Sequence, residues 1–261
     1  MRAMQFICLF CVFALIVLSG CNQNSLIEKF ASPEDKTTAT KYIALLRQKQ
    51  FEPIERDLDP SLKSDLKQDT LEKMANAIPT QEPVSVKIVG AYSSQEDDIY
   101  KDDLTFEYEF PTNWLLINVA TQKKSGVSTI IGFNVYEMSD SLENLNKFTL
   151  AGKNLLQYAM LAFAILVPLF IVYTLVLCIR TKMKRRKWLW IIFILIGIGK
   201  FTVNWTNGHV SIGLLYFQLL GASSFAPPYG AWLISVSLPL GAILFLVRHN
   251  RLIAPVESPS N

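Results

Sequence analysis

The side chain best suited to chemistry in this chain is the thiol of Cys21, because of the residues that precede it. Arg2 is followed by an apolar run over residues 6–18, and a Ser-Gly pair then leads into the cysteine. A charged start, a short apolar run and small residues form the pattern of a secretory signal peptide. The run is too short to cross a bilayer core of about 30 Å. The pattern therefore predicts an exported chain with a removable leader.

The stretch Leu18-Ser19-Gly20-Cys21 resembles the lipobox of bacterial lipoproteins. In that family the thiol is alkylated by a diacylglyceryl group, the chain is cleaved before the cysteine, and the freed amine can be acylated, for example with palmitate. The resemblance implies that residues 1–20 are the signal peptide and that cleavage falls between Gly20 and Cys21. Cys21 would then carry the lipid. The alternative is an uncleaved anchor in which the cysteine stands by chance.

Other reactive groups are scarce. The chain has two histidines, His209 and His249, so residues 22–150 lack the usual partner for acid–base chemistry and the usual metal ligand. We therefore expect no catalytic residues, no metal and no cofactor. An acidic run is either a calcium site or, as we prefer because the spacing of a known calcium loop is missing, a solvated hairpin tip. Its members are Glu96, Asp97, Asp98, Asp102 and Asp103.

Charge divides the chain into two unlike halves. Residues 22–150 contain 14 bases and 21 acids, a net of −7, whereas residues 151–261 contain 10 bases and 1 acid, a net of +9. The basic charge flanks long apolar runs rather than covering a soluble face, so it does not indicate nucleic-acid binding. It indicates a lipid bilayer as the partner of the second half.

Three apolar runs predict three transmembrane helices, over residues 155–179, 188–205 and 231–247. The loop between the first two holds six bases, which favours a cytoplasmic position. A lipidated Cys21 outside the cell then gives one consistent orientation, with the C-terminus in the cytoplasm. We expect a multi-pass protein of the bacterial cell (inner) membrane, with a membrane domain over 155–250 and a cytoplasmic tail over 251–261.

Two features of this half leave alternatives open. Segment 206–230 is expected to lie on the outer side, as an interfacial or re-entrant stretch, with a pore-lining loop as the less favoured interpretation. Lys200 is the one ionisable residue inside a predicted span, and such residues mark function by default. Because it lies near the outer end of its span, we favour an ammonium group that reaches the interface.

The outer part is predicted to be an α+β domain over residues 33–139, between a lipidated tether over 21–32 and a linker over 140–154. Helical spacing of apolar residues begins after Ser32 and Pro33 and predicts three helices before residue 80. From residue 84 the apolar period changes to two, which predicts four antiparallel strands. The helices should cover one face of the sheet.

The order of elements, with "ALLRQKQFEPIERDLDP" before a curled sheet, resembles the nuclear-transport-factor-two-like (cystatin-like) cone fold. That family includes enzymes, ligand-binding pockets and dimerisation modules, so the resemblance implies a cone without fixing its function. Aromatic side chains are candidates to line a cone pocket, although ordinary core residues are the preferred interpretation. These are Tyr42, Tyr92, Phe106, Tyr108, Trp114 and Phe133.

We expect a non-enzymatic binding or scaffold protein of the cell envelope, with an envelope protein as its partner. One alternative is a receptor or enzyme that takes a small ligand or lipid in the cone. The other is a transporter or channel subunit built from the spans, Lys200 and segment 206–230.

Overall fold

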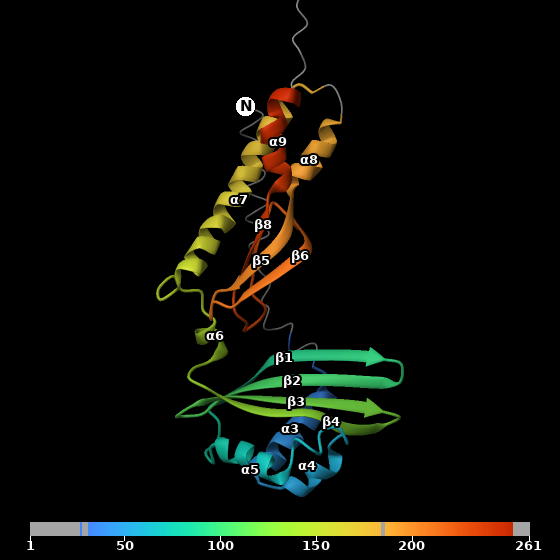
Figure 1. The fold of residues 1–261 in the computed structure, drawn as a ribbon. Helices are drawn as coiled ribbons and strands as arrows, with labels where there is room; N and C mark the ends of the chain where they lie inside the picture. Colours follow the sequence, from blue (N-terminus) through green and yellow to red (C-terminus); the bar gives the residue numbers. More distant parts are fainter. Residues whose placement is uncertain (1–26, 28–30, 184–185, 253–261) are drawn as a thin grey trace, which may run out of the picture. The chain divides into compact units, whose positions relative to one another are not determined.

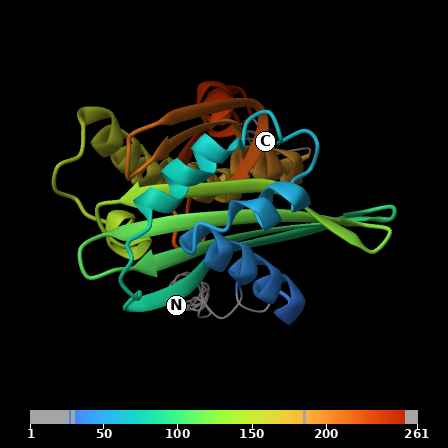
Figure 2. The same cartoon turned by 90° about the horizontal axis from the view of Figure 1, so that it is seen from below.

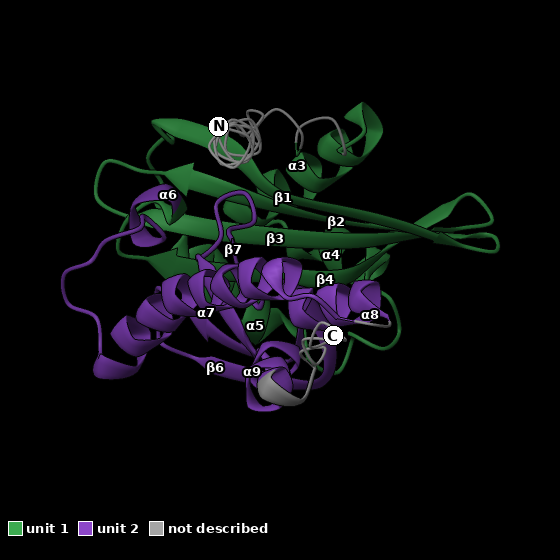
Figure 3. Cartoon of the chain, turned by 90° about the horizontal axis from the view of Figure 1, so that it is seen from above, with its two compact units in different colours: residues 1–142 green, residues 143–261 purple. Residues whose placement is uncertain are grey.

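The computed structural model describes residue 27, residues 31–183 and residues 186–252 (Figure 1). The predicted lipobox, with Gly20 and Cys21, lies outside the described residues. The chain divides into two compact units, residues 1–142 and 143–261 (Figure 3).

The first unit begins with the three predicted helices. They are α3 (Pro33–Arg47), α4 (Phe51–Asp57) and α5 (Gln68–Ala77). The predicted start of α3 is confirmed: the side chain of Ser32 accepts a hydrogen bond from the backbone N–H of Asp35 at 3.2 Å, and Pro33 occupies the first turn. Such a cap satisfies one of the free N–H groups of the first turn, and proline has no N–H there to leave free.

The four predicted strands form one antiparallel sheet in the order β1-β2-β3-β4, so each strand pairs with the next along the chain. Their bounds are β1 (Ser85–Glu96), β2 (Ile99–Glu109), β3 (Trp114–Lys124) and β4 (Val127–Met138). The helices α3, α4 and α5 lie on one face of this sheet (Figure 2). The predicted α+β arrangement of this part of the chain is therefore confirmed.

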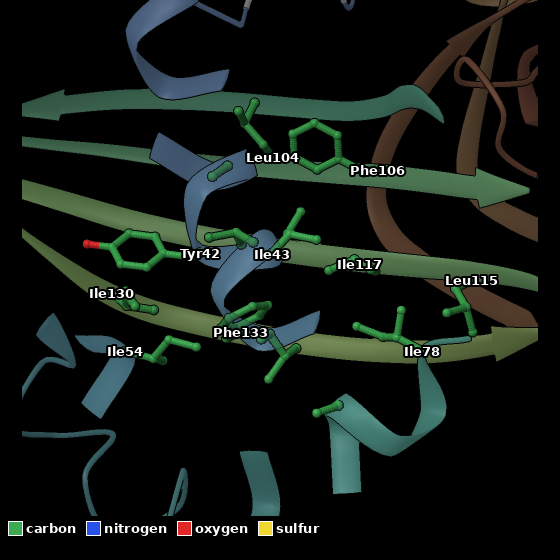
Figure 4. Close-up of a cluster of buried hydrophobic side chains, with 14 of the residues drawn as sticks. Tyr42, Ile43, Ile54, Ile78, Leu104, Phe106, Leu115, Ile117, Ile130 and Phe133 are labelled. Carbon is green, nitrogen blue, oxygen red and sulfur yellow. The ribbon is translucent and has the colours of Figure 1, made fainter. Parts of the chain in front are cut away.

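The core of the first unit fills the space between the helices and the sheet (Figure 4). Helix residues such as Ile43 and Ile54 meet strand residues such as Ile117 and Phe133, and each of these side chains is at most 1% exposed. Burial of apolar side chains on this scale is the main favourable term in folding.

The second unit combines helices with a second four-stranded sheet. Its helices are α7 (Leu155–Arg180), α8 (Lys187–Leu195) and α9 (Leu240–Leu252), preceded by the short α6 (Leu142–Leu145). The sheet order is β6-β5-β8-β7, and all pairs are antiparallel. The strands are β5 (Ile196–Asn204), β6 (Val210–Leu219), β7 (Ala222–Phe225) and β8 (Leu233–Leu238).

This unit corrects the prediction of an all-α domain with three transmembrane helices. Within the described residues, α7 is the one helix whose length and composition suit a membrane crossing. The apolar run over 188–205 changes from α8 to β5 after Leu195, and the run over 231–247 changes from β8 to α9 around Pro239. Segment 206–230 is also not a plain loop, because it contains β6 and β7. An unbroken apolar run does not reveal by itself whether it is a helix or a strand.

The mixed segments nevertheless match α7 in length. The 26 residues of α7 extend over about 39 Å at 1.5 Å per residue. The 9 residues of α8 and 9 of β5 together extend over about 43 Å, and the 6 of β8 and 13 of α9 over about 39 Å. Three stretches of similar length therefore run between the same two ends of the unit.

Close packing joins the three helices at one end (Figure 1). Ile171 and Cys178 of α7, Ile194 of α8 and Phe245 of α9 are buried in one apolar cluster. Gly241 allows α9 to approach the backbone of α8, because an added Cβ would lie 1.9 Å from the carbonyl oxygen of Phe193. A side chain at position 241 would force these helices apart.

Candidate functional surfaces

The candidate pocket aromatics do not line one cavity. Four of them, Tyr42, Phe106, Tyr108 and Phe133, are at most 5% exposed and belong to the buried core of the first unit. The register places Tyr92 beside Asp103 and Trp114 beside Glu109, on the opposite face of the sheet. The helix-covered side of the sheet is therefore filled by side chains.

One buried tyrosine in this core has a polar partner. The hydroxyl of Tyr42 donates a hydrogen bond to the carboxylate of Asp57 at 3.1 Å. Burial, and then the neighbouring carboxylate of Asp57, raise the pKa of Tyr42 to about 12. The hydroxyl is thus kept protonated and held in place, which suits a structural role in the core.

The face of the first sheet that α3, α4 and α5 leave uncovered is the most varied surface of that unit. Tyr92 is 68% exposed and Tyr136 is 58% exposed, and both lie on this face with the half-buried Trp114. Asn118 donates hydrogen bonds to Asp103 and to Thr105, between the aromatic side chains. We call this set of residues the open face. Exposed aromatic side chains beside fixed polar groups are typical of protein-binding surfaces.

An acidic corner lies where the first turn of α3 meets the start of β2. The carboxylate of Asp102 is buried and accepts a hydrogen bond from Ser93 at 2.6 Å. Burial raises its pKa, and the nearby carboxyls of Asp35 and Glu34 raise it further against the opposing effect of Ser93. Lys123 forms an ion pair with Glu34 at 2.8 Å.

The structure divides the acidic run of the sequence between the hairpin turn and this corner. Asp97 occupies the exposed hairpin turn, as preferred, whereas Asp102 turns inward on the helix side of the sheet. Among the described residues, no group of three or more histidine, cysteine and acidic side chains could hold a metal ion. The corner brings the carboxyl groups of Glu34, Asp35 and Asp102 near one another. Ser32 donates a hydrogen bond to Asp35, and Ser93 donates one to Asp102.

The first unit also has a surface cavity of about 370 Å³ beside the last turns of α3 and α5. Arg47 and Lys49 contribute to its wall, but both are already engaged. Arg47 bonds the carbonyl of Gln81 at 3.2 Å and pairs with Glu82 at 3.3 Å, while Lys49 bonds Asn76 at 2.8 Å. Cations at the ends of helices stabilise the helices themselves. The two basic side chains in the wall of this cavity therefore have a structural role.

The second unit has a polar interior. Thr202 and Ser235 share a buried hydrogen bond of 2.9 Å between β5 and β8. The buried Ser237 donates to the half-buried Gln218 at 2.5 Å, and Gln218 in turn donates to the exposed Ser223 at 2.5 Å. These bonds satisfy the polar side chains that the sheet encloses, as buried polar groups require. The buried hydroxyl groups of Thr202, Ser235 and Ser237 are thus hydrogen-bonded within the unit, which suits a structural role.

The two ends of the second unit differ in their side chains. At one end, Trp205 stacks on Phe148 at 5.0 Å and lies edge-on to Tyr158. Its indole N–H donates to the carbonyl of Thr149 at 2.8 Å. Aromatic side chains with one polar atom are enriched at membrane–water interfaces. We call this the aromatic end.

The opposite end holds most of the cations of this unit, whereas Lys153 lies at the aromatic end. Arg180 ends α7, Lys187 begins α8, and Arg248 lies in the last turns of α9. Thr181 and His249 are in contact there, with 3.0 Å between the hydroxyl oxygen and Nε2. We call this the basic end. The described residues between the two ends carry exposed apolar side chains and one cation, Lys200.

Lys200 lies in β5, and its ammonium nitrogen is 5.5 Å from the centre of the Tyr216 ring of β6. A cation over the face of an aromatic ring is attracted by the negative charge of that face. Between residues 143 and 252 the sequence contains one acid, Glu143, so the unit supplies almost no carboxylate to Lys200. The sequence had marked Lys200, but nothing in it pointed to Tyr216.

Comparison of the chain with protein families, with curated proteins and with solved structures gave no match.

Proposed function

We propose that this chain is a lipid-anchored, multi-pass protein of the bacterial cell membrane whose outer domain is a non-enzymatic binding or scaffold module. The lipid anchor is Cys21, and the membrane portion is the second unit. The proposal joins the lipobox resemblance to the arrangement of the two ends of that unit.

The distribution of side chains over the second unit supports a membrane position. Three passes of about 40 Å would cross a hydrocarbon core of about 30 Å and reach the headgroups on both sides. Large apolar side chains on α7 are exposed, among them Leu155, Phe163 and Leu169. Basic residues favour the cytoplasmic side, so the basic end would face the cytoplasm and the aromatic end the outside.

The open face is the single observation that carries the binding role. The helix side of the first sheet is filled by core residues, while the other side exposes Tyr92 and Tyr136. Exposed aromatic groups of this kind are common anchors of protein interfaces. The partner is expected to be another protein of the cell envelope, because the tether and the second unit would keep this domain close to the membrane.

The test is extraction of the full chain from its native membranes in mild detergent, followed by mass spectrometry of the proteins that remain bound. A stoichiometric partner should be retained by the natural protein and lost when Tyr92 and Tyr136 are both changed to serine. Val86→Ser is the matched control, because Val86 is also exposed, at 46%, but pairs with Tyr108 and so lies on the helix-covered face of the same sheet. Retention of the partner by the double variant would refute the role of the open face.

The membrane part of the proposal has its own measurement. The intact mass should correspond to a chain without residues 1–20 and with a lipid on Cys21, and Cys21→Ser should abolish the added mass. The protein should also stay in the membrane fraction after washing with alkaline carbonate. Release by that wash would contradict the assignment of the second unit.

A further inference from the structure

The strongest unexplained feature of the second unit is an irregularity in the pairing of β5 with β6. Ile198 pairs with Phe217 and Lys200 pairs with Gly213, so one residue of β5 lies opposite three residues of β6. Gly199 is the residue of β5, and Leu214, Leu215 and Tyr216 are the three residues of β6. A bulge of this kind redirects side chains, and bulges are frequent beside functional sites.

The bulge sends its side chains in two directions. Leu214 is 78% exposed and Leu215 is 94% exposed, so both project away from the unit. Tyr216 instead folds back across Gly213, where an added Cβ would lie 2.6 Å from Cδ2 of the ring. Glycine at position 213 thus leaves the space that lets the tyrosine reach Lys200.

The site combines one cation, one phenol and two exposed leucines. Apart from the Tyr216 ring, no partner is found for the ammonium group of Lys200 among the described residues. Thr202 pairs with Ser211 two positions further along β5, and its hydroxyl is already bonded to Ser235, which leaves the exposed Ser211 and Tyr216 as the hydroxyl groups of this stretch of β6. An ammonium group and hydroxyl groups bind phosphate oxygens, and leucine side chains suit acyl chains.

The position of Lys200 along its pass points to the same ligand. The 9 residues of α8 extend over about 14 Å from Lys187, and Ile196 to Lys200 adds about 16 Å. Lys200 thus lies about 30 Å from the basic end, which is the thickness of a bilayer core. If the basic end contacts the inner headgroups, Lys200 lies at the level of the outer headgroups.

We propose that Lys200 and Tyr216 bind the phosphate headgroup of an anionic phospholipid in the outer leaflet, with an acyl chain against Leu214 and Leu215. The inference rests on the membrane position proposed above for the second unit. It goes beyond a lysine that merely reaches the interface, because it assigns the bulge, Gly213 and the tyrosine to one binding site.

The experiment reconstitutes the full chain into nanodiscs made of phosphatidylglycerol and phosphatidylcholine. The protein is then released in mild detergent, and the two lipids that remain bound are quantified by mass spectrometry. The matched control for Lys200→Gln is Lys153→Gln, because the ammonium group of Lys153 also lies over an aromatic ring, that of Trp205, at 5.8 Å. Both substitutions remove one cation from an aromatic partner.

We expect Lys200→Gln to lower the enrichment of phosphatidylglycerol at least about tenfold, since a charge-assisted contact with a phosphate is lost at a formed site. Lys153→Gln should lower it by about fivefold or less, which is the general attraction of one cation to an anionic surface. Equal effects of the two substitutions would overturn the proposal. So would unchanged enrichment in Lys200→Gln.

A second variant keeps the charge and changes only the shape. Gly213→Val should displace the Tyr216 ring and lower the enrichment although Lys200 remains, and insertion into nanodiscs with natural circular dichroism confirms the fold. Displacement of the lipid by inorganic phosphate at equal concentration would show a site for soluble phosphate and refute the lipid assignment. Failure of the chain to stay in carbonate-washed membranes would instead refute the proposed function, so the two failures are distinguishable.

Discussion

The two units of this chain use the same parts in opposite ways. Each joins three principal helices to a four-stranded antiparallel sheet. In the first unit the large apolar side chains lie between helices and sheet, and the polar ones lie outside. In the second unit many large apolar side chains are exposed, while Ser235, Ser237 and Thr202 are buried along with the apolar cluster that joins its helices. The difference teaches that the same elements can enclose a mainly apolar core or one that also holds hydrogen-bonded hydroxyl groups.

The comparison also explains how each unit encloses its polar groups. The first unit buries few polar side chains, and two of them, Asp102 and Glu107, have hydrogen-bond donors. The carboxylate of Glu107 accepts from the backbone N–H of Leu142 at 2.6 Å. The second unit instead links hydroxyls and amides across several strands. A buried polar network is favourable only when its members are satisfied.

The largest expected effect comes from replacing a buried isoleucine of the first unit by alanine, compared with the same change at an exposed isoleucine of the second. Ile130 of the first unit is fully buried and Ile212 of the second is 61% exposed. Ile130→Ala should lower the free energy of unfolding by about 2–5 kcal/mol, because it leaves a cavity in the core. Ile212→Ala should change it by about 0.5 kcal/mol or less. Both values are measured by unfolding the full chain with urea in detergent and detecting the unfolding of each unit by its cleavage with a protease.

This pair tests the contrast directly. If Ile212→Ala destabilised its unit as strongly as Ile130→Ala destabilises the first, the apolar exterior of the second unit would belong to a packed interface. The claim that its side chains face a lipid environment would then be wrong.

A smaller effect is expected from the polar interior of the second unit. Gln218 accepts a hydrogen bond from the buried Ser237 and donates one to the exposed Ser223, so Gln218→Leu leaves one buried hydroxyl group without this partner. The expected cost is about 1–3 kcal/mol, the usual penalty for leaving buried polar groups unpaired. Thermal unfolding in detergent measures it, with Ser211→Ala as the control, because Ser211 is exposed on β6. A leucine at position 218 that stabilised the unit would show that its interior prefers apolar side chains.

The first unit was predictable from local sequence because its signals are local. Period-two alternation over residues 104–110 and 127–135 predicted strands that the structure has, and the Ser32-Pro33 start of α3 was confirmed. Each of these patterns reports on one element and one solvent-facing side. The sequence therefore indicated which residues form the core of this unit.

The second unit was only partly predictable, because hydropathy reports length and burial rather than backbone conformation. The run over 155–179 was correctly predicted as a helix. The runs over 188–205 and 231–247 contain both helix and strand, and apolar side chains on all sides hide the change. One signal was present: Ser235 and Ser237 alternate with apolar neighbours, which is the period of a strand.

The candidate sites show the same limit. Lys200 was marked by its charge in an apolar run, but its contact with Tyr216 depends on a bulge that brings together residues far apart in sequence. The contact between the first turn of α3 and Asp102 likewise depends on the packing of a helix on a strand. Such pairings are set by tertiary structure, so local patterns could not give them.

The smallest expected effect is a pH dependence confined to the first unit. The pKa of Asp102 is raised in the folded protein, so the folded chain binds more protons than the unfolded chain between the ordinary pKa and the raised one. Stability should therefore fall as pH rises through that range and stay lower above it. Asp35 and Glu34 face this carboxyl with negative charge, and Lys123 offsets them through its pair with Glu34.

Asp102→Asn should remove this dependence and make the first unit more stable at neutral pH. An amide can still accept the hydrogen bond from Ser93, and it offers Asp35 a donor without a proton that must be lost. Asp97→Asn is the control, since it removes the same charge from the exposed hairpin turn and should leave the slope of stability against pH unchanged. Urea midpoints at a series of pH values would measure the slopes. A slope that persisted in Asp102→Asn would place the titrating group elsewhere. A slope lost in that variant alone would show that burying one carboxyl group lowers the stability of the first unit at neutral pH. The interior of the second unit, whose buried polar groups are uncharged, avoids this cost.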